Sequence, residues 1–204
     1  MLAAKPHGSI SGHGRKQVVA FMRVITGTAR GKRLATREGE AVRPTPERVK
    51  EALFSIVQFE IEGRRVLDLF AGSGQLGIEA LSRGAREAVF VDSSRESAAV
   101  VRKNVESCGF ADTARIEIMD FASFLMRSEK PFDLAFLDPP YRTGLLQRAL
   151  PLTVSKMNPG GTVICENPMD EELPEEAGDF VRQRQYRYGK ICLTVYRRKD
   201  VTSE

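Results

Sequence analysis

The chain has 204 residues, of which 42% are hydrophobic and 28% charged, and these values exclude wholesale disorder and indicate one globular domain with a small appendage. No run of about 18 apolar residues is present, which argues against a membrane span. The three cysteines are widely spaced, so they predict neither a disulfide framework nor a zinc site, and they favour a cytoplasmic location. Residues 1–50 hold eleven Lys/Arg against three Asp/Glu, whereas the remainder carries a net charge of −4. This imbalance predicts a polyanionic partner, although a merely solvated basic segment would have the same composition.

The N-terminal quarter divides into three segments. Residues 1–21 predict a flexible leader or an expression remnant, because no apolar core of a signal peptide follows the early lysine. Residues 22–45 predict a basic extension with a small β-hairpin, punctuated by glycines. Its charged side chains, expected to be exposed and separate from the rest of any site, are candidate RNA contacts: Arg30, Lys32, Arg33 and Arg37. A helix then spans about Pro46–Val57, with Thr45 as its N-cap.

Strands and helices alternate from residue 64 onward. Apolar runs predict strands at 65–70, 87–92, 114–120, 132–140 and 160–167, and helical periodicity predicts helices at 74–84, 95–109, 121–128 and 143–157, the last kinked or split by Pro151. Two strands around Gly189 end the pattern, and the acidic segment 170–179 predicts a loop or short helix. The alternation is typical of an α/β protein with a parallel sheet covered by helices on both faces.

Small residues join the first strand to its helix. The segment Asp68–Gly77 reads DLFAGSGQLG, and glycines at such a turn let the backbone approach a ligand closely. Asp68 precedes the glycines, where a carboxylate would repel a pyrophosphate but suit the cationic S-adenosylmethionine. Asp92 ends the second predicted strand and can accept from ribose hydroxyls. Asp120 ends the third, as an adenine ligand or as the N-cap of the next helix. A tight turn without a ligand would give the same glycine string.

The fourth strand ends in Asp138-Pro139-Pro140-Tyr141. An exocyclic aromatic amine needs two acceptors to orient it, and the Asp138 carboxylate and the Pro139 carbonyl can supply them. Tyr141 can stack on the base, which must leave its own stack to enter. The motif therefore predicts methyl transfer to an amine nitrogen, and no metal is required.

Four segments together are similar to the RsmD family, the bacterial 16S rRNA guanine-N2 methyltransferases: ITGTARGKRL, RPTPERVKEALF, LDLFAGSGQLGIEALSRGA and FLDPPY. The resemblance implies a Rossmann-like methyltransferase domain over 46–198 with a tail at 199–204. Its seven strands would follow the order 3-2-1-4-5-7-6, with strand 7 antiparallel. The implied reaction is methyl transfer from S-adenosylmethionine to guanine N2, with guanine 966 as the family target, within an assembled small ribosomal subunit.

The resemblance also implies roles for individual residues. The cofactor would contact Arg43, Thr45, Asp68, Phe70, Ala71, Gly72, Gly74, Asp92, Ser93, Asp120 and Phe121. The guanine amine would be held by Asp138, Pro139, Pro140 and Tyr141. Relatives often carry Glu where this chain has Asp92, a difference that would shift the ribose slightly. Two alternatives stay open: an adenine-N6 methyltransferase acting on DNA or RNA, and an RNA-binding module that has lost activity.

Overall fold

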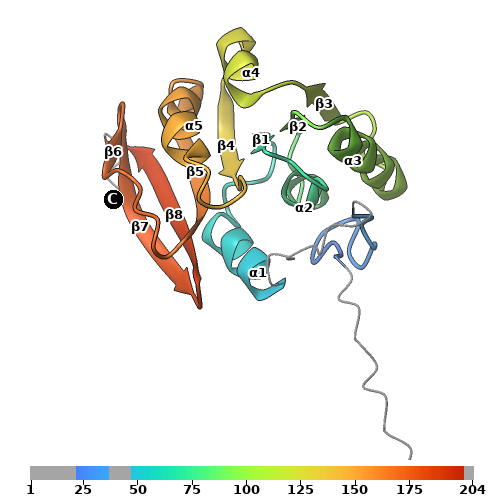
Figure 1. Ribbon diagram of the computed structural model, residues 1–204. Coiled ribbons are helices and arrows are strands. Elements are labelled where there is room, and N and C mark those ends of the chain that lie inside the picture. Colours follow the sequence, from blue (N-terminus) through green and yellow to red (C-terminus); the bar gives the residue numbers. More distant parts are fainter. Residues whose placement is uncertain (1–21, 37–46, 200–204) are drawn as a thin grey trace, which may run out of the picture.

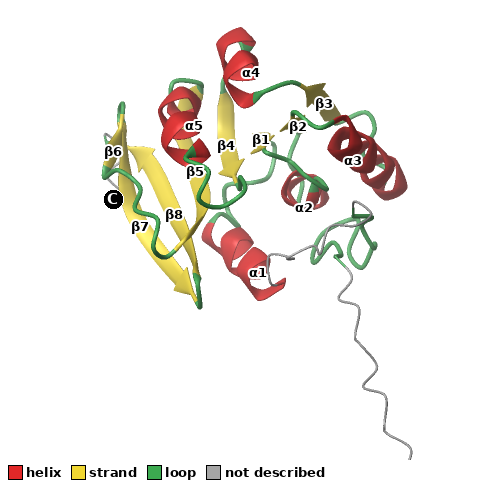
Figure 2. Cartoon of the chain, in the orientation of Figure 1, coloured by secondary structure: helices red, strands yellow, loops and turns green. Residues whose placement is uncertain are grey.

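The computed structural model describes residues 22–36 and 47–199 of the chain. One mixed sheet runs through this part, and the helices lie on its two faces (Figures 1 and 2). In spatial order its strands are β3 (Ala114–Ile118), β2 (Glu87–Asp92), β1 (Arg65–Leu69), β4 (Phe132–Leu137), β5 (Met157–Pro168), β8 (Ile191–Arg198), β7 (Phe180–Tyr188) and β6 (Glu176–Ala177). The first five strands of this order are parallel and the last three pairings are antiparallel.

The α/β fold class and the strand order expected from the sequence are confirmed. The structure adds one strand, β6, inside the acidic segment that the sequence predicted as a loop or short helix. A two-residue strand has no periodicity to detect, and it forms here because Glu176 and Ala177 pair with the start of β7. The sheet therefore has eight strands, with the β8–β7–β6 meander at one edge.

Helices follow most strands. They are α1 (Glu47–Ile56), α2 (Gln75–Ser82), α3 (Arg95–Cys108), α4 (Phe121–Arg127) and α5 (Leu145–Val154). Ser94 caps α3 by accepting from the Ser97 N–H, and Gly109 ends that helix in the left-handed conformation. Pro151 lies inside α5, which continues past it as one helix, so of the predicted kink or split the split does not occur. The proline is exposed, so water can satisfy the carbonyl that it leaves without an amide partner.

Two apolar cores fill the space between the sheet and its helices. Helices α1, α2 and α3 bury Leu53, Ile78 and Val101 on one face, and α4 and α5 bury Phe124 and Leu150 on the other. The carboxyl ends of the parallel strands all point to one edge of the sheet, where ligands bind in open α/β folds. None of the helices in the described ranges is long and apolar enough to cross a membrane.

Candidate active site

A cavity of about 980 Å³ opens at the carboxyl ends of the central parallel strands. Most residues that the sequence placed at the site line it: Asp68, Phe70, Ala71, Gly72, Asp92, Ser93, Asp120, Phe121, Asp138, Pro139, Pro140 and Tyr141. Gly74 is the exception within the described chain, and Arg43 and Thr45 lie outside the described residues. The glycine loop and the Asp138–Tyr141 motif therefore share one cavity, since β1 and β4 are neighbours with Leu69 paired to Leu137.

The two glycines of the loop do different things. Gly72 has φ +55°, and a Cβ built on it would meet nothing within 4 Å, so this residue faces open space. Gly74 has φ +78°, and a Cβ there would lie 3.2 Å from Val101 and 3.3 Å from Phe90. Gly74 thus lets α2 begin close to α3 and β2, and the expectation that both glycines face a ligand is wrong for Gly74.

Two carboxylates hold the loop in place. Asp92 accepts from the Gly72 N–H at 2.9 Å and from the Ser94 N–H at 2.8 Å. Asp68, buried at the end of β1, accepts from the Gly77 N–H at 2.9 Å. Burial raises the pKa of Asp68 to about 7, against the lowering effect of the Gly77 hydrogen bond and with a smaller contribution from the charge of Asp92. Asp68 therefore lines the cavity as a carboxyl group whose ionised form a bound cation would stabilise.

An aromatic pair, Phe70 of the loop and Phe121 of α4, also lines the cavity. The rings of Phe70 and Phe121 are 5.4 Å apart between centroids and tilted by 50°. Phe70 has φ +74°, a strained conformation for a non-glycine residue, and both residues line the cavity. Asp120 accepts from the Ser123 N–H at 3.0 Å as the N-cap of α4. Hydrogen bonds from the Ser123 side chain and from its backbone N–H hold the pKa of the Asp120 carboxyl below the usual value. Asp120 is therefore the N-cap of α4, one of the two functions that the sequence left open, and it also lines the cavity.

The Asp138–Tyr141 motif follows β4 directly. Burial and the neighbouring charges of Glu166 and Asp68 raise the pKa of Asp138 well above its usual value. The Pro140 carbonyl already accepts from the Thr143 hydroxyl at 2.7 Å, whereas Pro139 is buried against the cavity wall. The Tyr141 hydroxyl donates to Glu166 Oε1 at 2.7 Å, which fixes the ring beside the motif.

Sequence reasoning missed part of the cavity wall. The unanticipated lining residues are Met22, Thr36, Ser73, Gln75, Leu76, Val91, Ser94, Ser97, Met119, Leu145, Arg148, Glu166 and Ile191. Most carry no sequence signal, because only tertiary packing brings them to this edge. Glu166 did carry a sequence signal, because it follows the apolar residues of the predicted fifth strand. It therefore belongs to the edge of the sheet where the parallel strands end and ligands bind.

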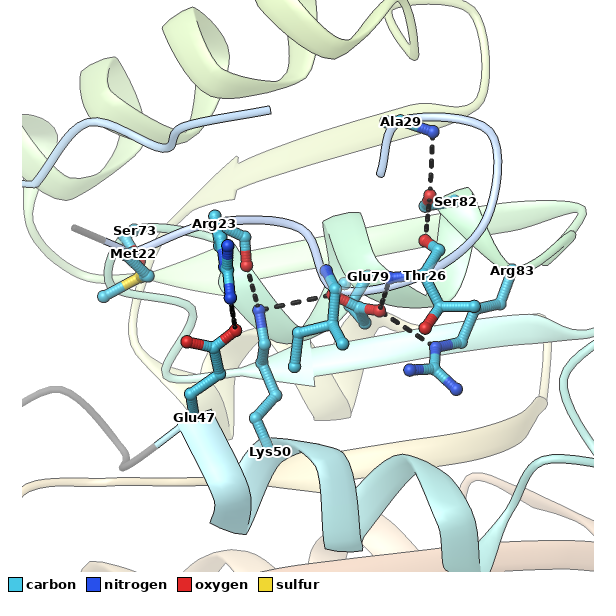
Figure 3. Close-up of polar contacts among 12 residues, drawn as sticks. Met22, Arg23, Thr26, Ala29, Glu47, Lys50, Ser73, Glu79, Ser82 and Arg83 are labelled. Carbon is cyan, nitrogen blue, oxygen red and sulfur yellow. Dashed lines mark hydrogen bonds and ion pairs between the residues drawn. The ribbon is translucent and has the colours of Figure 1, made fainter. Parts of the chain in front are cut away.

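The basic segment 22–36 is docked on the helices rather than free of them (Figure 3). Glu79 of α2 is fully buried and accepts from the backbone N–H groups of Ile25 at 2.7 Å and Thr26 at 2.9 Å. Its charge is balanced by Lys50 at 3.3 Å and by Arg83 at 3.0 Å. The segment has no apolar stripe in its sequence, but three single apolar residues at intervals of five positions fill the core beneath it: Val24, Ala29 and Leu34.

The expectation that this segment is separate from the glycine loop is wrong. Asn104 of α3 is buried and exchanges two hydrogen bonds with the backbone of Ala35, at 2.7 and 2.9 Å. The same amide donates to the Ser73 carbonyl of the glycine loop at 2.9 Å. Met22 and Thr36, near the two ends of the segment, line the cavity. Arg30, Lys32 and Arg33 are exposed as expected, and Arg37 lies outside the described residues.

The chain is similar in sequence to proteins of one known family. Residues 22–197 match the model of the family described as Conserved hypothetical protein 95. The Escherichia coli K12 protein named Ribosomal RNA small subunit methyltransferase D is 32% identical over 96% of this chain and 95% of its own length. The chain belongs to the RsmD family.

Further RsmD-family similarity extends to other relatives and to solved structures. A Haemophilus influenzae protein of the same name is 34% identical, over 74% of this chain and 81% of its own length. A solved structure of a hypothetical protein of Thermus thermophilus superposes with a TM-score of 0.73 at 32% identity, covering 85% of this chain and 97% of its own length. The family match begins at residue 22, so the docked basic segment belongs to the RsmD family domain.

Proposed function

We propose that this protein transfers a methyl group from S-adenosylmethionine to the exocyclic N2 amine of a guanine in small-subunit ribosomal RNA. The observation that carries the proposal is the single cavity that joins the glycine loop to the Asp138–Tyr141 motif. Family membership supports a methyltransferase that acts on ribosomal RNA, as the names of the relatives state. Guanine 966, within an assembled subunit in the cytoplasm, is the target implied by the resemblance.

The cavity residues fit S-adenosylmethionine in volume and in charge. Asp68 would face the cationic end of the molecule, and the open space beside Gly72 would admit its amino-acid portion. The Asp92 carboxylate accepts from the Gly72 and Ser94 N–H groups, and its remaining lone pairs would accept from the ribose hydroxyls. Ser93, the next residue, would also lie near the ribose. When bound, S-adenosylmethionine supplies an electrophilic methyl group. Phe70 and Phe121 would hold its adenine ring, with Asp120 at the edge.

The substrate amine would be oriented by two acceptors, the Asp138 carboxylate and the Pro139 carbonyl. Holding both N–H bonds turns the nitrogen lone pair toward the methyl donor, so the rate enhancement comes mainly from positioning. Asp138 accepts most strongly when it is ionised, and a cation bound nearby would favour that form against the burial and the neighbouring acids that raise its pKa. The amine loses its surplus proton after attack, and the ionised carboxylate of Asp138 lies next to it to accept that proton.

Exposed basic residues would bind the RNA. Arg30, Lys32 and Arg33 project from the docked segment, and Arg37 follows them in sequence. Because residues 51–204 carry a net negative charge, this segment supplies most of the attraction to phosphates. The buried anchor at Glu79 fixes its position relative to the cavity.

The deciding experiment incubates the protein with radiolabelled S-adenosylmethionine and small subunits that lack the modification, and then identifies the labelled nucleoside. N2-methylguanosine is the expected product. Labelled N6-methyladenosine would establish the adenine alternative, and no label at all would favour a binding module without activity. The Gly72→Val variant serves as a cofactor control, because its side chain would occupy open space in the cavity. We expect it to lose S-adenosylmethionine binding in calorimetry, and circular dichroism checks that it folds, since φ +55° strains a β-branched residue.

A further inference from the structure

A second carboxylate, that of Glu166, lies beside Asp138 in the cavity. Strands β4 and β5 are parallel neighbours with Leu137 paired to Cys165, so the next residues along, Asp138 and Glu166, lie side by side. Both line the cavity, and only 3% of Glu166 is exposed. The Tyr141 hydroxyl donates to Glu166 at 2.7 Å and so sets the direction of the carboxylate.

Burying this second acid near Asp138 and Asp68 is costly, because like charges in a poorly solvated site repel one another. The effect is visible at Asp138, whose pKa is raised in part by the charge of Glu166. A carboxylate offers about four acceptor positions, so Glu166 can accept from the Tyr141 hydroxyl and from more than one other donor. Glu166 is therefore suited to accept an N–H from a group that also reaches Asp138.

The edge of the target base supplies such a group only if the base is guanine. In guanine the N2 amine is adjacent to N1–H, a donor, so two neighbouring carboxylates meet two neighbouring donors. In adenine the N6 amine is adjacent to N1, whose lone pair would face a carboxylate and be repelled by it. Unstacked bases are commonly recognised through hydrogen bonds on this edge.

We propose that Glu166 accepts a hydrogen bond from guanine N1–H and so selects guanine over adenine, an inference that rests on the proposed function. Asp138 then orients the amine that reacts, and Glu166 fixes the identity of the base that presents it. A buried site that hydrogen-bonds a polar group rejects an analogue lacking that group by about 10⁴-fold or more in the strongest cases. For one such contact we expect a preference of at least about 10²-fold.

The test compares guanine with 2-aminopurine at the methylated position of small subunits assembled with ligated RNA. 2-Aminopurine keeps the reacting amine but replaces N1–H with a lone pair. The wild-type protein should methylate guanine at least about 10²-fold faster in kcat/KM than 2-aminopurine. Glu166→Gln should lower kcat/KM for guanine at least about tenfold. Because the glutamine amide can donate to N1 of 2-aminopurine, the ratio of kcat/KM for guanine to that for 2-aminopurine should also fall at least about tenfold. The missing O6 of 2-aminopurine affects both proteins equally, so it cancels in this comparison.

Two controls separate recognition from damage. Glu172→Gln changes an exposed acid of the loop after β5 and should retain the wild-type rate and preference. Glu166→Asp keeps the charge and should keep the preference for guanine at a reduced rate. If Glu166→Gln does not fold, the wild-type comparison of guanine with 2-aminopurine still tests the inference. A Glu166→Gln protein with an unchanged preference, or a wild-type protein that accepts 2-aminopurine as well as guanine, would overturn the inference while leaving guanine-N2 methylation intact. A wild-type protein that labels no guanine N2 would refute the proposed function itself.

Discussion

Two groups of carboxylates differ in their surroundings: Glu79 lies on α2, whereas Asp68 and Asp138 lie at the carboxyl ends of β1 and β4. Glu79, under the basic segment, receives two backbone N–H groups and two cationic side chains. Asp68 and Asp138, in the cavity, have no cationic side chain within ion-pair distance in the described parts of the chain. Burial raises the pKa of both cavity acids, to about 7 for Asp68.

The difference separates an anchor from a binding site. A buried charge that protein groups fully compensate holds two segments together, and its acceptor positions are already used, so it is not suited to bind a ligand. A buried acid without an internal cation costs stability until a ligand brings the positive charge or the donors that it lacks. The following experiments test whether the two groups differ in this way.

The largest effect is expected at the anchor. Glu79→Gln leaves Lys50 buried, at 2% exposure, without its counter-charge, and removes the ion pair with Arg83. We expect a loss of about 3–5 kcal/mol in the free energy of unfolding, measured by urea titration. The control is Glu117→Gln, which breaks the exposed pair with Arg115 and should cost less than about 1 kcal/mol. Equal losses in the two variants would show that Glu79 is not an anchor.

Asp138→Ala should have the next largest effect, and on activity rather than on folding. The variant loses one acceptor for the substrate amine, so methylation should fall by about 10²-fold or more. Affinity for S-adenosylmethionine should change little, and stability should not fall, because burial and neighbouring acids disfavour the charge of this carboxyl. Turnover within about a factor of two of wild type, at saturating substrates, would remove Asp138 from the reaction.

The binding of S-adenosylmethionine should depend on pH through Asp68. Its pKa of about 7 means that the carboxyl is largely ionised above pH 7 and becomes protonated below it. A cationic ligand favours the ionised form, so affinity should fall toward tenfold per pH unit as the pH drops below 7. Calorimetry from about pH 5.5 to 8 checks this. Asp68→Asn should bind more weakly at about pH 8 and lose the dependence, and a variant that kept the same slope would assign it to another group.

The smallest effect is expected at the surface of the docked segment. Changing Arg30, Lys32 and Arg33 together to Ala should weaken binding to small subunits severalfold and lower the salt slope by up to about 2.7, since each phosphate contact contributes about 0.9. Affinity for S-adenosylmethionine should remain within about twofold, because these side chains are exposed and do not line the cavity. An unchanged salt slope would move the RNA contact to the basic strand residues Arg182–Lys190.

The central sheet was predictable from the sequence because its strands and helices carry strong local patterns. β2 was predicted with its observed bounds, and the glycine loop and the Asp138–Tyr141 motif were both placed at the correct strand ends. What the sequence did not reveal depends on contacts between distant segments. Examples are the docking of residues 22–36 on Glu79, the packing function of Gly74, and the proximity of Glu166 to Asp138. No local periodicity encodes such contacts, because they exist only once the helices lie on the sheet.

The Asn104 side chain has a thermodynamic consequence for how the two substrates bind. One amide connects Ala35, which follows the exposed basic residues, to Ser73 of the glycine loop. If RNA displaces the basic segment even slightly, the wall of the cavity formed by Met22 and Thr36 is displaced with it. Linkage then requires reciprocity: the factor by which RNA changes the affinity for the methyl donor equals the factor by which the donor changes the affinity for RNA. The donor-loaded and the empty protein would then bind RNA with different affinities, and a single buried asparagine would carry the coupling between the two ligands.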